Sequence, residues 1–218
     1  MLIKILTSAV AVFIAIIAHE IAHGYVARFL GDNTAAKAGR LSLNPLRHID
    51  FFGTIIVPIL LFLSKAGFIF GWAKPVPVNY NALRRRKRDI VLVAAAGIIT
   101  NLLLAALSSL LLQLTLWLPS TLFSGILAMF WLNMILFNIV LAVFNLLPIP
   151  PLDGSKILLG WSDNFYVQKF LNAERGGLIF IIVLAFVLPT LLQTADISFN
   201  PFAIYLKQAT LLLVGWLI

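Results

Sequence analysis

Two of the three histidines in this chain, His19 and His23, lie four residues apart with Glu20 between them, inside an apolar run. On a helix, residues four apart share a face, so both imidazoles can bind one Zn²⁺ while Glu20 stands beside a water molecule on the metal. Ionisable side chains inside a membrane helix are costly and usually mark function. The spacing therefore predicts a hydrolytic zinc site. The alternative is a pair of structural histidines, with Glu20 paired to Arg28.

A catalytic zinc keeps three protein ligands and one open position, so a third ligand must come from elsewhere in the chain. Asp153 stands out among the acidic residues because it closes a proline-rich break, 145–154, directly after an apolar run. Irregular backbone at membrane depth is tolerated only where protein buries it or where it lines a watery cavity. Two alternatives stay open: Asp153 is a helix cap, or Glu174 is the third ligand.

The composition identifies a membrane protein, because 61% of the 218 residues are hydrophobic, only 11% are charged and the mean hydropathy is +1.03. A bilayer-spanning helix needs roughly 20 apolar residues. We therefore predict an all-α polytopic helical bundle of about five to six membrane segments. The apolar runs are 2–28, 52–70, 90–118, 124–147, 177–192 and 202–218.

We expect one transmembrane domain over residues 1–218, with a catalytic core at about 1–160 and additional C-terminal helices at about 177–218. The first apolar run is longer than the core of a signal peptide and lacks a small-residue cleavage site, so we expect it to remain in the mature protein. With no cysteine in the sequence, cysteine proteases and Cys-ligated zinc are excluded.

The formal charge of +8 comes partly from a basic run at 84–88. Beside an apolar helix, such a run indicates the cytoplasmic face and contact with anionic lipid rather than with nucleic acid. The basic residues of 28–51 and of 71–88 place both intervals in the cytoplasm. The run 52–70 is then a re-entrant hairpin or a surface-lying helix. With that topology, 2–28 and 124–147 end at the same face, so the metal ligands can converge.

Polar side chains on the later helices are candidates for work near the metal. Gly97 and Asn101 share one helix face, where the glycine permits close helix approach. Asn138 and Asn145 share a face of the next helix. Asn101 and Asn138 either hold the bundle together or serve the site. We assign Asn145 to orienting the substrate or stabilising an oxyanion, because donors aimed at developing charge contribute strongly in a dry site.

His48, oriented by Asp50, is a further candidate for a group near the metal, with solvated loop residues as the alternative. The segments around 39–43 and 76–79 have an extended, turn-punctuated character. An edge strand there would bind an unwound substrate segment by adding a β-strand.

The His-Glu-x-x-His motif together with Leu152-Asp153-Gly154 resembles the signature of the site-2 protease family. Further family-like stretches are 39–50, 71–79 and 96–101, so the resemblance covers roughly residues 15 to 160. Ile98 departs from the pattern, since family members commonly carry proline after the glycine. The chain looks like the compact branch of the family, which has no inserted PDZ domain.

The resemblance implies an intramembrane zinc endopeptidase that cleaves transmembrane protein substrates within the bilayer. His19, His23 and Asp153 would bind the metal, and Glu20 would take a proton from the attacking water and pass it to the leaving amine. The resemblance also implies a prokaryotic cell membrane and an active site nearer the cytoplasmic face. The alternative function is a zinc or proton transporter that uses His19, Glu20 and His23, although the sequence contains no second copy of the motif.

Overall fold

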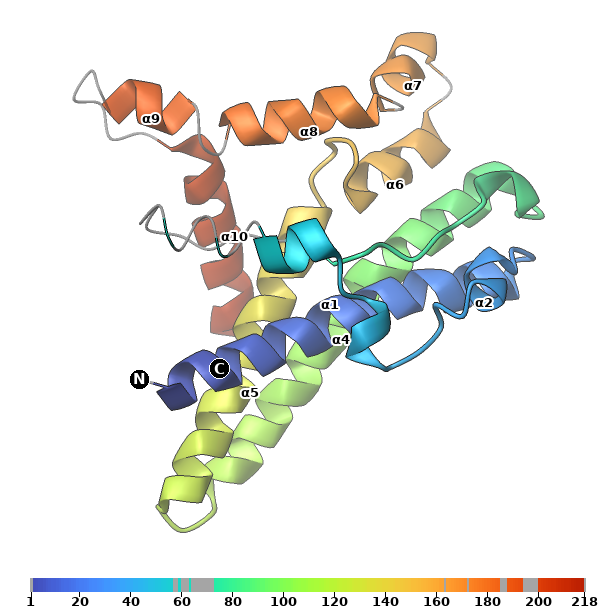
Figure 1. Ribbon diagram of the computed structural model, residues 1–218. Coiled ribbons are helices and arrows are strands. Elements are labelled where there is room, and N and C mark those ends of the chain that lie inside the picture. Colours follow the sequence, from blue (N-terminus) through green and yellow to red (C-terminus); the bar gives the residue numbers. More distant parts are fainter. Residues whose placement is uncertain are drawn as a thin grey trace.

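The computed structural model describes residues 2–56, 59, 63, 73–162, 164–171, 173–184, 188–193 and 200–217. Every regular element in these ranges is helical (Figure 1), in agreement with the predicted all-α class. The α-helices are α1 (Leu2–Phe29), α2 (Thr34–Lys37), α4 (Arg86–Leu116), α5 (Leu122–Asn145), α6 (Asp153–Trp161), α7 (Phe165–Leu171), α8 (Glu174–Ile182), α9 (Leu188–Gln193) and α10 (Pro201–Leu217). Short 3₁₀ or π turns lie at Pro45–Arg47, Phe51–Ile56 and Tyr80–Ala82.

Three helices are long and apolar enough to cross a membrane: α1, α4 from Lys87 onward, and α5. The predicted count of five to six membrane segments is not confirmed. Helix α10 has 17 residues and so extends about 26 Å, less than the roughly 30 Å of a bilayer core. The predicted run 177–192 is divided between α8 and α9. Most of the run 52–70 lies outside the described residues.

The ends of the membrane helices follow local signals in the sequence. Helix α5 begins with a capping box, in which the Thr121 hydroxyl accepts from the backbone N–H of Ser124 and the Ser124 hydroxyl accepts from the N–H of Thr121. Helix α1 is followed by Gly31, whose φ of 115° suits glycine and stops the helix. At the start of α4, the Asp89 carboxylate accepts from the backbone N–H of Arg85.

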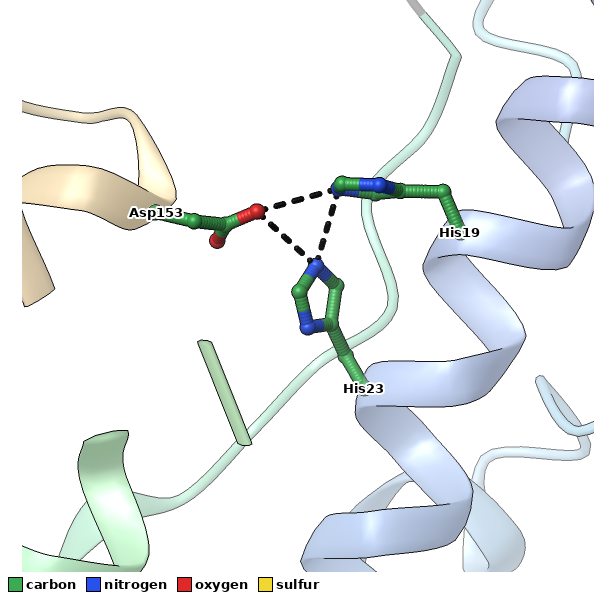
Figure 2. A group of neighbouring side chains, drawn as sticks. All are labelled: His19, His23 and Asp153. Carbon is green, nitrogen blue, oxygen red and sulfur yellow. Dashed lines mark hydrogen bonds and ion pairs between the residues drawn. The ribbon is translucent and has the colours of Figure 1, made fainter. Parts of the chain in front are cut away.

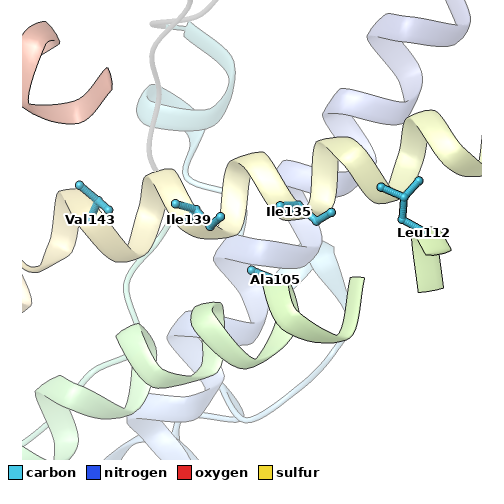
Figure 3. Close-up of a cluster of buried hydrophobic side chains, with 5 residues drawn as sticks. All are labelled: Ala105, Leu112, Ile135, Ile139 and Val143. Atoms are coloured by element: carbon cyan, nitrogen blue, oxygen red, sulfur yellow. The ribbon is translucent and has the colours of Figure 1, made fainter. Parts of the chain in front are cut away.

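The three membrane helices pack against one another, and α4 and α5 form an antiparallel pair joined by the short turn 117–121 (Figure 1). The apolar core lies between α4 and α5 and is lined by Ala105, Leu112, Ile135, Ile139 and Val143 (Figure 3). Part of α10 packs against this core, so the last helix covers one side of the pair. As a result, α1 and α5 finish at the same end of the bundle, where α4 starts.

The connection from α1 to α4 leaves and returns at this one end. The backbone N–H of Arg84 donates to the carbonyl of Leu30 at 3.2 Å, and the N–H of Lys74 donates to the carbonyl of His48 at 2.9 Å. A single complete crossing between residues 48 and 74 would separate them by roughly 30 Å, so no net crossing occurs there. Residues 48 and 74 therefore lie at the same end of the bundle, while the cytoplasmic side and the re-entrant form of 52–70 stay predictions. The re-entrant path itself falls largely outside the described residues.

The predicted edge strand is not formed, since neither 39–43 nor 76–79 is a strand in the described chain. The backbone groups of these segments are used differently. The N–H of Val76 donates to the Glu20 carboxylate, and the N–H of Asn79 donates to the Asp32 carboxylate. The N–H of Arg40 closes a turn onto the carbonyl of Ala35. Because these bonds go to side chains and local turns, no strand ladder develops.

Candidate metal centre

Three potential ligands from distant parts of the chain meet at the end of the bundle (Figure 2). The Nε2 atoms of His19 and His23, one turn apart on α1, lie 3.0 Å from each other. Asp153 approaches from the first residue of α6, with Oδ2 at 3.0 Å from His19 Nε2 and 3.2 Å from His23 Nε2. All three residues are buried. The model thus brings together the ligand set that the sequence predicts.

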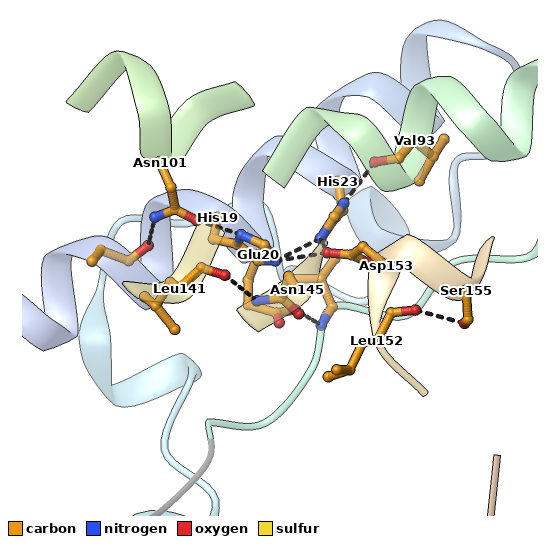
Figure 4. Close-up of polar contacts among 12 residues, drawn as sticks. His19, Glu20, His23, Val93, Asn101, Leu141, Asn145, Leu152, Asp153 and Ser155 are labelled. Carbon is orange, nitrogen blue, oxygen red and sulfur yellow. Dashed lines mark hydrogen bonds and ion pairs between the residues drawn. The ribbon is translucent and has the colours of Figure 1, made fainter. Parts of the chain in front are cut away.

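Helix α4 closes over the two imidazole rings. A Cβ atom at Gly97 would lie 2.5 Å from His19 Cε1 and 2.6 Å from His23 Nε2, so only glycine fits against the rings. On α4, one residue before this glycine and one after it contact the Nδ1 atoms of the two rings (Figure 4). His23 Nδ1 lies 2.7 Å from the carbonyl oxygen of Val93, and His19 Nδ1 lies 2.6 Å from Asn101 Oδ1.

The donor set fits a zinc ion. A carbonyl oxygen can only accept, so His23 Nδ1 carries the hydrogen and the Nε2 of the neutral ring offers a lone pair. That lone pair faces the carboxylate of Asp153, whose Oδ2 is buried and accepts no hydrogen bond. Such atoms repel one another unless a cation lies between them. Ligands about 2.0 Å from a tetrahedral zinc are about 3.3 Å apart, close to the separations found here.

Asp153 lies at the point where the loop 146–152 enters α6. The next residue, Gly154, packs against the backbone carbonyl of Leu146, where a side chain would overlap it. The loop is therefore folded tightly enough to return Asp153 to the end of α1.

Glu20 lies on α1 beside the two ligands and is anchored from the connection before α4. Its Oε2 accepts a hydrogen bond of 2.7 Å from the backbone N–H of Val76 (Figure 4). Val76 is buried, and its side chain, with that of Leu41, would meet a Cβ placed at Gly24. This glycine lets the connection lie close against α1. One oxygen of the Glu20 carboxylate is thereby fixed in place.

Asn145 lies at the last turn of α5, before the loop that carries Asp153. Its side-chain nitrogen donates to the carbonyl of Leu141, one turn back on the same helix, at 3.0 Å. In the described structure its hydrogen bonding does not reach the metal ligands. An amide nitrogen carries two hydrogens, so Asn145 retains a second N–H for another acceptor. The assignment of Asn145 to the substrate carbonyl remains a prediction.

His48 and Asp50 are placed away from the ligand cluster. His48 is almost fully buried and its Nε2 lies 2.7 Å from the carbonyl oxygen of Ser42, so the ring ties the loop together. The Asp50 carboxylate accepts from the backbone N–H of Gly53 and does not orient His48. For Glu174, the backbone begins α8, and its side chain lies outside what the structure describes.

Two partners of the site escaped the sequence analysis, namely the carbonyl of Val93 and the backbone N–H of Val76. Both are main-chain groups, which every residue except proline provides alike. Residue type therefore gives no signal for them. The position of Val93, one turn before Gly97 on the face of α4 that meets α1, is the single pattern that could have indicated it.

Comparison with known proteins gives a consistent family assignment. The model for peptidase family M50 matches residues 119–190, which include Asn145 and Asp153. A Bacillus subtilis protein named "Putative zinc metalloprotease YwhC" is 43% identical over 174 residues, covering 78% of this chain and 75% of its own. A Mycolicibacterium smegmatis protein named "Putative zinc metalloprotease Rip2" is 32% identical over 191 residues, covering 81% and 68%. No solved structure matches the chain significantly.

Proposed function

We propose that this chain, which belongs to peptidase family M50, the site-2 protease family, is an intramembrane endopeptidase that cleaves transmembrane protein substrates within or near the bilayer. That the chain is a zinc metalloprotease of the membrane follows from the family and from its apolar helices. The proposal adds where the peptide bond is cut and which residues cut it.

The depth of the ligands along α1 is the observation that carries the proposal. His23 and His19 precede Phe29, the last residue of this helix, by 6 and 10 positions. At a rise of 1.5 Å per residue they lie about 9 Å and about 15 Å inside the helix end. Helix α1 spans about 42 Å against roughly 30 Å of hydrocarbon, so ligands at these positions are within or at the edge of the apolar layer.

His19, His23 and Asp153 would hold the zinc ion, and Glu20 would act as general base. When bound there, zinc supplies Lewis-acid activation of a water molecule and of the substrate carbonyl. Glu20 takes a proton from the attacking water and delivers it to the leaving amine. The Val76 N–H holds Oε2 of this carboxylate, and we assign the proton transfer to Oε1. This anchor keeps the base in one orientation through both transfers.

We further assign Asn145 to the substrate, as a donor to its carbonyl oxygen or to a neighbouring backbone group. Its position between α5 and the loop to Asp153 supports this role, as does the second N–H of its amide. Substrate helices hide their carbonyls in internal hydrogen bonds, so cleavage requires a locally unwound segment. A donor such as Asn145 would replace one of the bonds that unwinding removes.

The charge distribution supports a cytoplasm-proximal active site in a prokaryotic cell membrane. Exposed basic residues gather at the site end of the bundle, including Arg28, Arg84, Arg85, Lys87 and Arg88. The turn 117–121 at the other end of α4 and α5 contains no charged residue. By the positive-inside rule, the site end faces the cytoplasm. The relatives described above come from bacteria, which supports the prokaryotic assignment.

Purified protein in detergent tests the proposal through two variants. Glu20→Gln keeps an acceptor for the Val76 N–H but removes the base, so zinc content should stay near one ion per chain while cleavage of a transmembrane substrate falls by about 10² or more. Asp153→Asn should weaken zinc binding. Glu174→Gln is the control and should change neither quantity. Zinc binding that ignores Asp153 but requires Glu174 would overturn the proposed ligand set.

A transport function is not favoured, because the relatives described above are named as zinc metalloproteases. The same variants in liposomes separate the two activities. Protease function predicts cleavage by the wild type alone and no zinc flux from either form. Flux that depends on Glu20, with no cleavage by the wild type, would replace the protease assignment.

A further inference from the structure

We propose that Asn101 is a positioning residue for the metal site and that Asn138 fixes Asn101 in the orientation it needs. The two amides and the ring of His19 form a hydrogen-bond chain across α1, α4 and α5. Figure 4 shows the bond between Asn101 and His19. This chain sets which nitrogen of His19 carries hydrogen and therefore which one offers its lone pair to the metal. The inference rests on the proposed function, since it concerns the same zinc site.

The residues of this hydrogen-bond chain are all buried, so water does not compete for their hydrogen bonds. Asn101 and Asn138 are both 0% exposed, although neither is an apolar residue. Buried amides that lack hydrogen-bond partners destabilise a protein. Here each amide has partners on neighbouring groups. The two buried amides therefore hold one defined hydrogen-bonded arrangement.

The orientation of both amides in this hydrogen-bond chain is set by a backbone contact on α5. Asn138 Nδ2 donates to the backbone carbonyl of Met134 at 2.8 Å, which leaves Asn138 Oδ1 as the acceptor on the inner side. Asn101 Nδ2 donates to this oxygen at 2.7 Å and also approaches the carbonyl of Ala15 at 3.2 Å. Reversing the Asn101 amide would set its oxygen against two other acceptors, so the reversed orientation is unfavourable.

With Asn101 in this orientation, its Oδ1 faces His19 Nδ1 at 2.6 Å and can only accept. His19 therefore carries its hydrogen on Nδ1, and Nε2 is left with a free lone pair. Nε2 is the atom that faces Asp153 and His23. His23 reaches the same state through the carbonyl of Val93. The two ligands are thus oriented by different means, one by a side chain and one by the backbone.

Because a backbone carbonyl cannot be removed by mutation, His19 is the ligand whose support can be tested. Asn101→Leu removes both the acceptor for His19 and the donors to Ala15 and Asn138. Asn101→Asp keeps an acceptor for His19 but loses the donors, so that a carboxyl oxygen faces the acceptors of Ala15 and Asn138. Carboxylates commonly support metal-bound histidines in this way. A pure packing role for Asn101 predicts that the two variants behave alike, whereas positioning predicts that they differ.

The experiment measures the affinity of the detergent-purified chain for Zn²⁺ by competition with a chelating dye. We expect Asn101→Leu to bind zinc about 10- to 100-fold more weakly than the wild type, and Asn101→Asp to bind it more tightly than Asn101→Leu because an acceptor for His19 is restored. Asn138→Leu should cause a smaller loss than Asn101→Leu, because it affects His19 only through Asn101. If Asn101→Leu does not fold, Asn101→Ser gives the same comparison with a side chain too short to reach His19.

Asn133→Leu is the matched control. Asn133 lies on the same helix as Asn138 and its amide also bonds to α1, donating to the Thr7 hydroxyl at 3.1 Å, but far from the ligands. The Asn133→Leu variant should bind zinc with the same affinity as the wild type. Equal affinities for Asn101→Leu and the wild type would overturn the positioning role and leave the proposed function intact. A wild-type chain that binds no zinc would overturn both.

Discussion

The membrane helices α1, α4 and α5 and the C-terminal helices α7–α10 contribute to this protein in different ways. In the first group, polar side chains from three helices point at one place, and glycine brings α4 against the imidazoles. Among the described residues, no ligand of the metal cluster comes from the second group. There, α10 packs its apolar side chains on the core between α4 and α5.

Near the site, the C-terminal helices contact the loop 146–152, which leads from α5 to Asp153. A Cβ added to Gly177 in α8 would overlap the backbone of Pro150, in the loop that carries Asp153. The C-terminal helices can therefore influence zinc binding through the position of this loop, while the membrane helices influence it directly. The membrane helices thus contain residues that form the site, whereas the C-terminal helices contain residues that pack around it. Substitutions in each region can test this distinction.

The largest expected effect is on stability and comes from the core that both regions share. Ile139 is fully buried among the side chains of α4 and α5, and Ile139→Ala should destabilise the protein by about 2–5 kcal/mol. Leu212→Ala on α10, where the side chain is 63% exposed, should change stability by less than about 0.5 kcal/mol. Unfolding in mixed micelles measures both. Equal losses would show that the Leu212 side chain is packed as tightly as that of Ile139.

The second effect is on zinc binding and uses paired glycines. Gly97→Ala places a methyl group 2.5–2.7 Å from atoms of His19 and His23 and should weaken zinc affinity about 100-fold, or about 2.7 kcal/mol. Gly215→Ala on α10 meets no atom within 4 Å and should leave the affinity unchanged. Competition with a chelating dye checks both variants. Wild-type affinity in Gly97→Ala would contradict the close approach of α4.

A smaller effect is expected where the C-terminal helices touch the ligand loop. Gly177→Ala should displace the loop at Pro150 and weaken zinc binding about tenfold. The neighbouring Gly176→Ala is the control, because its Cβ would approach only Ala173, at 3.8 Å. Zinc affinity is again the measurement. If both variants match the wild type, the C-terminal helices are independent of the metal site.

The smallest effect concerns the connection between α1 and α4 and depends on pH. Burial alone would raise the pKa of Asp32, but hydrogen bonds from Thr34 and from the backbone of Asn79 outweigh it and hold the pKa below its usual value. A lowered folded-state pKa stabilises the protein fully above the unfolded pKa of about 3.9, and the contribution is lost as pH falls below it.

The melting temperature of the wild type should therefore fall more steeply than that of Asp32→Asn between about pH 5 and pH 3. Parallel pH profiles for the two proteins would show that Asp32 adds no pH-dependent stability. Zinc affinity near neutral pH should be the same in both, because Asp32 is not one of the ligands.

The three residues of the candidate metal cluster could be predicted to lie together because each has a signal in residue type and spacing. His19 and His23 share a helix face by their separation of four, and Asp153 follows a proline-rich break whose motif resembles a known family. The charge pattern also predicted that residues 2–28 and 124–147 end together, which the structure shows. These features depend on local sequence and on a simple topological rule, so they could be derived without coordinates.

Other features were not predictable because they depend on pairing between distant segments. Asn101 and Asn138 carried no sign in the sequence that they bond to each other, since any buried amide can pair in several ways. The expected β-strand failed because the N–H of Val76 serves the Glu20 carboxylate instead of a strand partner. The predicted number of membrane segments is not confirmed, because three described helices are long and apolar enough to span a bilayer and much of 52–70 lies outside the described residues.

The separation of the ligands along the chain has a consequence for biosynthesis. His19 and His23 leave the ribosome 130 residues before Asp153, counting from His23, and α4 and α5 are made in between. A nascent chain that ends before residue 153 offers two imidazoles and no carboxylate, which is an incomplete site for zinc. With the proposed ligand set, metal acquisition would therefore follow synthesis of the helical bundle, and an unfinished chain in the membrane would lack the complete centre.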